Sequence, residues 1–156
     1  MSDTSIVIVS AKRTPVGAFQ GILSPLTTTQ LGAQVIQGVV TAAGLKNDEV
    51  NNVIMGCVLP AGLGQSPARQ ALIGAGLSHH TAALTVNKVC GSGLESIMLG
   101  DILLKSRSKV VVAGGMESMS NAPYFLPKAR SGYRMGHGEI IDHMMYDGLQ
   151  DAYSHK

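Results

Sequence analysis

The sequence predicts an α/β fold, with a mostly parallel β-sheet and helices on both of its faces. Short runs of β-branched and other apolar residues alternate along the chain with longer segments in which apolar residues recur at helical spacing. The short runs are apolar throughout, which is typical of parallel strands covered on both sides. With 156 residues, the chain has the length of one domain with a core of its own.

Four strands are predicted, each as a short apolar run bounded by polar residues, glycine or proline. They lie at residues 6–9, 53–59, 82–86 and 109–113. The first run, Ile-Val-Ile-Val, is β-branched at every position and predicts a strand buried on both faces.

Three helices are predicted between these strands. The first covers 28–43 with Leu31, Val35 and Val39 as its apolar row, and it stops at Gly44. The second begins with Ser66 as N-cap and Pro67 as first helical residue, and it ends near residue 74 or 76. The third holds Cys90 in its first turn and is expected to be mostly buried, with apolar residues recurring at helical spacing at Leu94, Ile97, Met98, Ile102 and Leu103.

After residue 116 the pattern changes. From Met116 onward, five methionines are interleaved with prolines and glycines, and little periodicity remains. We therefore expect 1–116 to form the α/β core and 117–156 to leave the sheet as an irregular excursion.

Composition narrows the class of protein. Only 14% of residues are charged, so we expect much of the surface to be covered by a partner or by further sequence. The net charge of +2, without a dense Lys/Arg cluster, argues against nucleic acid as a partner. No apolar run approaches the roughly 18 residues that span a bilayer, so no membrane association is expected. Two cysteines without a disulfide framework, and a start unlike a secretory signal, favour the cytoplasm.

Cys90 is the candidate nucleophile. It stands where the 82–86 strand gives way to a helix, and the sequence predicts that it lies in the first helical turn. Unpaired N–H groups and the helix dipole favour negative charge there, and the thiolate is the reactive form of cysteine. Gly91 and Gly93 carry no side chains, which allows backbone and substrate to approach the sulfur. The alternative is a buried cysteine that acts as a small apolar residue.

The other candidates are weaker. Cys57 lies inside a predicted strand and is expected to be a packed core residue. His79 and His80 fit an exposed turn, and His137 and His143 lack metal-ligand spacing, so no metal site is expected. A dinucleotide site is disfavoured, because no Gly-x-Gly-x-x-Gly opens the first helix and no acidic residue stands at ribose-binding spacing.

Four segments together resemble the thiolase family, and within it most closely the acetyl-CoA acetyltransferases. They are Ile8-Val-Ser-Ala-Lys-Arg-Thr-Pro-Val-Gly17, Gly62-Leu-Gly-Gln-Ser-Pro-Ala-Arg-Gln70, Asn87-Lys-Val-Cys-Gly-Ser-Gly-Leu94 and Ala113-Gly-Gly-Met-Glu-Ser-Met-Ser120. Condensing enzymes of related fold usually have a Cys-Ser-Ser context instead. The resemblance implies a thiolase-like fold: the N-terminal half of a duplicated αβαβα architecture in 1–116, and the start of an inserted loop domain in 117–156.

The resemblance also implies a reaction. Cys90 would accept an acyl group from acyl-CoA as a thioester, with its backbone N–H helping to hold the oxyanion. A carbanion from acetyl-CoA would then attack, giving acetoacetyl-CoA; the reverse is thiolysis. The family's Cys-x-Gly-Gly, Gly-His-Pro and Asn-Glu motifs, which supply the base and the remaining site, do not occur in this sequence. We therefore expect the chain alone to be inactive. The alternatives are a longer-chain 3-ketoacyl-CoA thiolase and a non-catalytic half-thiolase with a structural or regulatory role.

Further expectations follow from the same resemblance. Coenzyme A thioesters would be the substrates, and no cofactor would be required. The partners would be the C-terminal half of the same polypeptide and further copies, in a homodimer or homotetramer. Met135 would line the acyl pocket of a neighbouring subunit, although a gap-filling methionine is an equal alternative. His155 lies near the place of a substrate-lining His-Met pair, but the register does not assign it to that pair.

Overall fold

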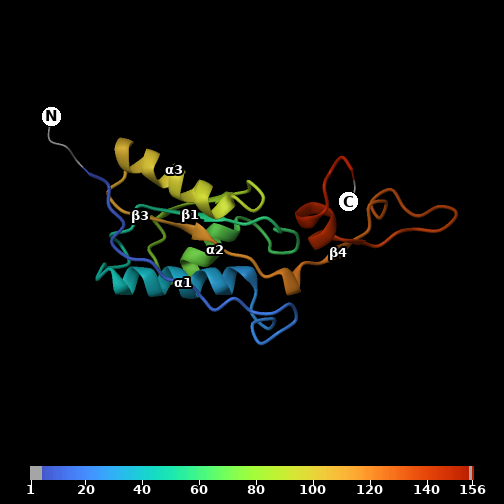
Figure 1. Cartoon of the computed structure of the whole chain (residues 1–156), viewed down its shortest axis with the longest axis horizontal. Helices are drawn as coiled ribbons and strands as arrows, with labels where there is room; N and C mark the ends of the chain where they lie inside the picture. Colours follow the sequence, from blue (N-terminus) through green and yellow to red (C-terminus); the bar gives the residue numbers. More distant parts are fainter. Residues whose placement is uncertain (1–4, 155) are drawn as a thin grey trace.

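Three parallel strands form the central sheet of the computed structural model, which describes residues 5–154 and 156 (Figure 1). β1 (Asn52–Gly56) lies between β2 (Ala82–Val86) and β3 (Val111–Gly115) and pairs in parallel with both. In this register Gly56 is the partner of Val86 and of Gly115, so the three strands end at one level. The predicted α/β class and the parallel arrangement are confirmed.

Helices cover both faces of this sheet. α2 (Pro67–Gly74) packs against β1 and β2, α1 (Thr28–Ala42) packs on α2, and α3 (Ser92–Ser106) covers the opposite face (Figure 1). The three predicted helices are confirmed. A capping box between Thr27 and Gln30 opens α1, and Gly44, with φ of +69°, follows its end as predicted.

The main core lies between the sheet and the α1–α2 layer. On α1 the buried row is Thr28, Gly32, Ile36 and Val40, one position along from the predicted row of Leu31, Val35 and Val39, which is only half-buried. The absence of a side chain at Gly32 explains this rotation. A Cβ there would lie 2.5 Å from Met116 Sδ and 3.2 Å from Ala71 Cβ. The helix therefore turns its small residue, rather than its leucine, toward the core.

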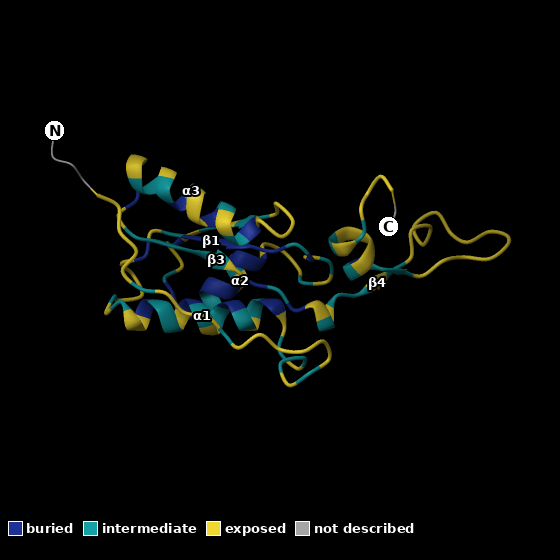
Figure 2. Ribbon diagram, in the orientation of Figure 1, coloured by how far each residue is buried: buried dark blue, intermediate teal, exposed yellow. Residues whose placement is uncertain are grey.

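The predicted burial of α3 is wrong. Its buried residues are Ser92, Ser96 and Gly100, whereas Leu94 is 65% and Ile102 58% exposed (Figure 2). The small residues let the helix approach the sheet closely, and the Ser96 hydroxyl donates to the Gly114 carbonyl at 2.7 Å. Because the small-residue row faces the sheet, the apolar row faces outward.

The predicted first strand at 6–9 is also wrong. These residues have no strand structure and are 39–81% exposed. A strand requires a hydrogen-bonded neighbour, and in the described part of the chain no strand pairs with this segment. The run therefore remains an uncovered apolar segment.

Two strand boundaries differ from the prediction because side chains take over backbone hydrogen bonds. β1 ends at Gly56 rather than residue 59, since Glu117 accepts the N–H groups of Val58 and Leu59. β3 begins at Val111 rather than residue 109, since Asn51 accepts the N–H groups of the two preceding residues.

The start of α2 differs in its capping. Ser66 is the N-cap residue as predicted, but its φ is +48° and its side chain makes no capping bond. Thr85 on the adjacent strand β2 performs that role, since its Oγ1 accepts the Ala68 N–H at 3.0 Å.

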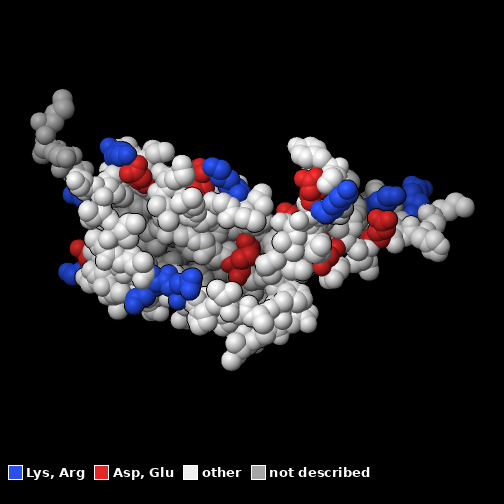
Figure 3. All heavy atoms as spheres, viewed as in Figure 1, with Lys and Arg blue, Asp and Glu red and all other residues white. Residues whose placement is uncertain are grey.

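Residues 117–154 extend away from the sheet, beyond one end of the core (Figure 1). The segment holds a 3₁₀ turn η1 (Met119–Asn121), a short antiparallel pair of β4 (Tyr124–Phe125) and β5 (Ile141–Asp142), and a π-helix η2 (Met144–Leu149). These small elements were not predicted. On the face in Figure 3, charged side chains form small scattered groups with uncharged surface between them. Within the described residues, every helix is too short or too polar to cross a membrane.

Candidate active site

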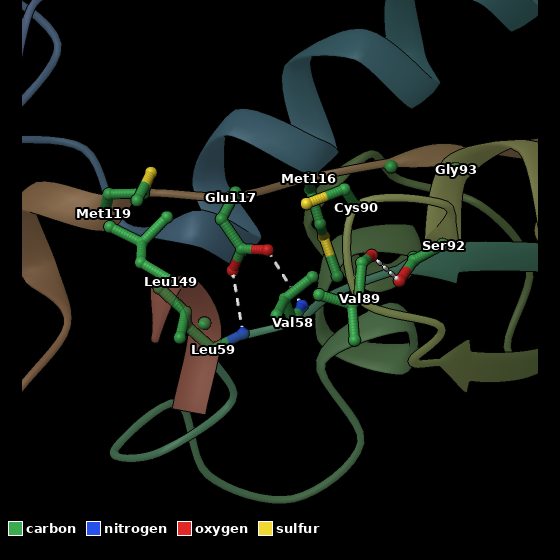
Figure 4. Close-up of a pocket in the computed structure, with 13 residues that line it drawn as sticks. Val58, Leu59, Val89, Cys90, Ser92, Gly93, Met116, Glu117, Met119 and Leu149 are labelled. Atoms are coloured by element: carbon green, nitrogen blue, oxygen red, sulfur yellow. Dashed lines mark hydrogen bonds between the residues drawn. The ribbon is translucent and has the colours of Figure 1, made fainter. Parts of the chain in front are cut away.

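A cavity of about 420 Å³ opens at the carboxyl ends of the strands (Figure 4). Parallel α/β sheets commonly bind ligands at this edge. The segments after β1 and β3, the turn before α3 and the end of η2 all contribute to its lining: Gly56, Val58, Leu59, Val89, Cys90, Ser92, Gly93, Gly115, Met116, Glu117, Met119, Gly148 and Leu149.

Cys90 is an exposed free thiol in the lining of this cavity. It precedes Gly91, the N-cap of α3, so it stands just before the helix and not in its first turn as predicted. Within the described residues, the backbone N–H groups of Cys90 and Gly93 donate no hydrogen bond. The site thus combines an accessible sulfur with free N–H donors and the positive end of a helix dipole.

A strained turn presents this sulfur. Val89 has φ of +49°, which is unfavourable for a β-branched residue. Its N–H donates to Asn87 Oδ1 at 2.9 Å, and its carbonyl accepts both the N–H and the hydroxyl of Ser92. The Ser92 hydroxyl, which is buried, also accepts the Lys88 N–H at 2.8 Å. Side chains from both sides of Cys90 therefore hold the turn in place.

Close backbone packing seats the start of α3 on the sheet. A Cβ on Gly56 would lie 2.6 Å from the Ser92 carbonyl carbon and 2.8 Å from the Gly93 nitrogen. Of the predicted glycines, Gly93 lines the cavity and its Cα faces Gly115, while Gly91 caps the helix. Among the glycines at this junction, the closest contact is at Gly56, which was not predicted from the sequence.

Glu117 is the only acidic residue in the cavity lining, within the described structure. Its Oε2 accepts the Val58 N–H at 2.8 Å, and its Oε1 accepts the Leu59 N–H at 3.1 Å (Figure 4). Cys57 Sγ lies 3.7 Å from the same carboxylate. Burial, and then the negative charge of Glu117, raise the pKa of Cys57 to about 12. Cys57 is therefore a protonated core thiol, which confirms the prediction for that residue.

The remaining predicted candidates lie away from the sulfur. Met135 is 98% exposed and does not contribute to the cavity. His79 and His80 lie in an exposed turn as predicted, and His137 is exposed. His155 lies outside the described residues. Among the described residues, no three His, Cys, Asp or Glu side chains gather closely enough to share a metal ion.

His143 has a structural environment that the sequence analysis missed. It is buried, its Nδ1 lies 2.5 Å from Asp147 Oδ2, and its Nε2 accepts the Ala61 N–H at 3.4 Å. It thus links η2 to the loop after β1. Because Gly148 and Leu149 of η2 line the cavity, this link helps to hold that wall against the core.

The sequence of this chain matches a known protein family. Residues 6–156 match the model of the thiolase N-terminal domain. The chain belongs to the thiolase family. An acetyl-CoA acetyltransferase of Cupriavidus necator is 51% identical over 152 residues, covering 97% of this chain and 39% of that protein. One from Schizosaccharomyces pombe is 47% identical over 154 residues, covering 98% of this chain and 39% of that protein.

A solved thiolase has the same fold. The Acat5 thiolase from Ascaris suum, in complex with coenzyme A, superposes with a TM-score of 0.91 at 35% identity, covering 95% of this chain and 38% of that one. The thiolase-like fold expected from the sequence is confirmed. The present chain spans about 39% of the length of the curated relatives named above.

Several residues of the site were missed from sequence. Glu117, Asn87 and Ser92 lie within the quoted motifs, but no chemical role was derived for them. A usable signal was present for Glu117, because it lies only four residues after the end of the predicted strand at 109–113. The carboxyl ends of parallel strands lie at one edge of a sheet, so the sequence placed this carboxylate at that edge. The pairing of β1 with β3, seen in the structure, then brings it to the segment after β1.

Proposed function

We propose that this thiolase chain supplies the acyl-accepting cysteine of an acetyl-CoA C-acetyltransferase. The observation that carries the proposal is the exposed thiol of Cys90 in a cavity beside free N–H donors at a helix start. The relatives named as acetyl-CoA acetyltransferases and the neighbour in complex with coenzyme A support this substrate class.

The proposed first step is transfer of an acetyl group to sulfur. The Cys90 thiolate attacks the thioester carbonyl, a carbon–sulfur bond forms, and coenzyme A leaves as its thiolate and takes up a proton. The free N–H groups near Cys90 stabilise the tetrahedral oxyanion. In the second step the carbanion of another acetyl-CoA attacks the acyl-cysteine, which releases acetoacetyl-CoA and regenerates the Cys90 thiolate. Thiolysis is the same sequence in reverse.

The second step needs a base to form the carbanion, and Cys57 does not suit that role. It is 1% exposed, and its raised pKa keeps it protonated near neutral pH. We therefore infer that the base comes from the C-terminal half of a complete thiolase, and that the chain alone accepts acetyl groups without turnover.

The partners we propose are that C-terminal half and further copies of the complete enzyme, as a homodimer or homotetramer. Exposed apolar residues on α3 and at 6–9 support a large covered surface. The exposed Met135 is compatible with its proposed place in the acyl pocket of a neighbouring subunit. We also propose that the division at 116/117 separates core from loop domain, and that the enzyme acts in the cytoplasm.

The test uses isotopically labelled acetyl-CoA and peptide mass spectrometry on the purified chain. We expect label on the peptide that contains Cys90, no label in Cys90→Ser, and retained label in Cys57→Ser. Absence of label from the wild-type chain would favour the non-catalytic half-thiolase. A parallel incubation with a longer acyl-CoA tests the alternative of a longer-chain 3-ketoacyl-CoA thiolase, which predicts preferential labelling by that substrate.

A further inference from the structure

We propose that Glu117 and Asn87 are positioning residues for Cys90, which act through one continuous chain of hydrogen bonds along the cavity. This inference rests on the proposed function, because positioning of Cys90 affects catalysis only if Cys90 accepts the acyl group. The chain of bonds runs from Glu117 to the backbone of Val58, from Val58 to Asn87, and from Asn87 to Val89, the residue before the nucleophile.

The Glu117 end of this chain is firmly held. Each carboxylate oxygen accepts a different backbone N–H, from Val58 at 2.8 Å and from Leu59 at 3.1 Å. Hydrogen bonds to an ionised acceptor are stronger than neutral ones. Two such bonds to successive residues fix both the position and the orientation of the segment after β1. They also occupy the carboxylate, so Glu117 acts through the backbone it holds.

Asn87 joins that segment to the turn of the nucleophile. Its Nδ2 donates to the Val58 carbonyl at 3.4 Å, a long bond, and its Oδ1 accepts the Val89 N–H at 2.9 Å. One amide side chain therefore bridges the loop after β1 and the turn after β2. Glu117, Val58 and Val89 line the same cavity as Cys90 (Figure 4).

The turn needs such support because Val89 is held at φ of +49°. A β-branched residue leaves this conformation unless its surroundings impose it. A change of Val89 would rotate the peptide that carries the Cys90 N–H and would redirect the sulfur. Displacements of about 1 Å in such groups lower reaction rates by up to roughly a hundredfold.

Single substitutions can each interrupt one link of this chain of hydrogen bonds. Glu117→Gln keeps the shape of the side chain but replaces one acceptor oxygen with an amide donor. Asn87→Asp keeps an acceptor for the Val89 N–H but removes the donor to the Val58 carbonyl, so it cuts one link only. Glu49→Gln is a matched control, because Glu49 also accepts a backbone N–H, that of Lys46 at 2.6 Å, and precedes the opposite end of β1.

The first readout is amide hydrogen exchange at Val58, Leu59 and Val89, followed by NMR. We expect Glu117→Gln to speed exchange at all three amides by roughly tenfold, the usual scale for one lost hydrogen bond. In the Asn87→Asp background, Glu117→Gln should no longer alter exchange at Val89, because the connecting link is already cut. Glu49→Gln should leave the three amides unchanged.

The second readout compares two reactions of the same sulfur. We expect Glu117→Gln and Asn87→Asp each to slow labelling of Cys90 by acetyl-CoA by roughly tenfold to a hundredfold. Alkylation by iodoacetamide, which needs only an exposed thiolate, should change less than about threefold. A merely structural role would slow both reactions together, and circular dichroism reports any loss of folding.

The outcomes separate the two proposals. Wild-type exchange at Val89 in Glu117→Gln, or additive effects of the two substitutions, would overturn the positioning chain. Absence of acetyl labelling in the wild-type chain would instead overturn the proposed function, while the exchange data would still decide whether Glu117 and Asn87 hold the Cys90 turn.

Discussion

The hydroxyl of Ser92 accepts the backbone N–H of Lys88 at 2.8 Å, across the turn that carries Cys90. The same hydroxyl donates to the carbonyl of Val89 at 2.5 Å. One side chain in the first turn of α3 thus closes the loop on either side of a residue with unfavourable φ, which links the helix start to the geometry of the nucleophile.

Removal of this hydroxyl should destabilise the protein and disturb the site. We expect Ser92→Ala to lower the free energy of unfolding by about 1–3 kcal/mol, because the Lys88 N–H loses its acceptor next to a buried position. Urea denaturation measures the change. The control is Ser106→Ala in the last turn of the same helix, where an exposed hydroxyl donates to the Leu103 carbonyl and the expected change is below about 0.5 kcal/mol. Equal effects of the two variants would contradict the role assigned to Ser92.

Gly56 should tolerate no side chain. In Gly56→Ala the new Cβ would lie 2.6–2.8 Å from backbone atoms of Ser92 and Gly93, which have no flexible end to move aside. We expect a loss of about 1–3 kcal/mol in the free energy of unfolding and slower labelling of Cys90, since α3 must shift away from the sheet.

A matched glycine-to-alanine substitution on α1 tests whether the loss of stability is specific to Gly56. In Gly38→Ala the nearest atom to the new Cβ is 3.9 Å away, so the higher helix propensity of alanine should stabilise the protein by about 0.5–1 kcal/mol. Thermal denaturation of both variants should therefore give shifts of opposite sign. A neutral Gly56→Ala would show that the start of α3 is not seated as described.

The pKa of Cys57 predicts a loss of stability in alkali. Its value rises from 9.0 to about 12 in the folded protein, so between these pH values the folded state retains a proton that the unfolded state has released. Stability is therefore fully present below pH 9 and falls as the pH rises toward 12. We expect Cys57→Ala to remove part of this decline, measured as the difference in urea midpoint between pH 8 and pH 10. An unchanged slope would mean that burial and Glu117 do not hold the proton on this thiol.

The positions of the helices and of most strands were predictable from sequence, because apolar runs and apolar residues at helical spacing are local patterns. β2 was predicted with both of its ends, and the three helices were found. The 6–9 run has the most strand-like composition in the chain, yet it forms no strand. Composition sets only the propensity of a segment for strand structure. A strand forms only where a second strand pairs with it, and composition does not show whether such a partner is present.

The candidate nucleophile was predictable from the sequence, but the residues that hold its turn in place were not. A cysteine between a strand and a helix, with glycines around it, identified Cys90 as the candidate nucleophile. The residues that hold its turn act through backbone groups distant in sequence, as Glu117 does with Val58. Such contacts depend on strand order, which no local pattern records. The same limit explains why α3 was wrongly predicted to be mostly buried, since helical spacing of apolar residues does not show which residues face the sheet.

The outward row of α3 leads to the last prediction. Ile97 and Ile102 are 46% and 58% exposed, so lysine at both positions should change the free energy of unfolding of the isolated chain by no more than about 0.5 kcal/mol each. If this face packs against the C-terminal half of a thiolase, the same substitutions place two charges in an apolar interface. We therefore expect the wild-type chain, but not the double variant, to bind the remaining C-terminal part of the Cupriavidus necator relative in a purified two-component assay.

The control is Gln34→Lys, on the exposed face of α1, which adds the same kind of charge and should leave binding intact. Equal binding by the double variant would show that the outward row of α3 is not the contact surface, because buried lysines without partners are costly.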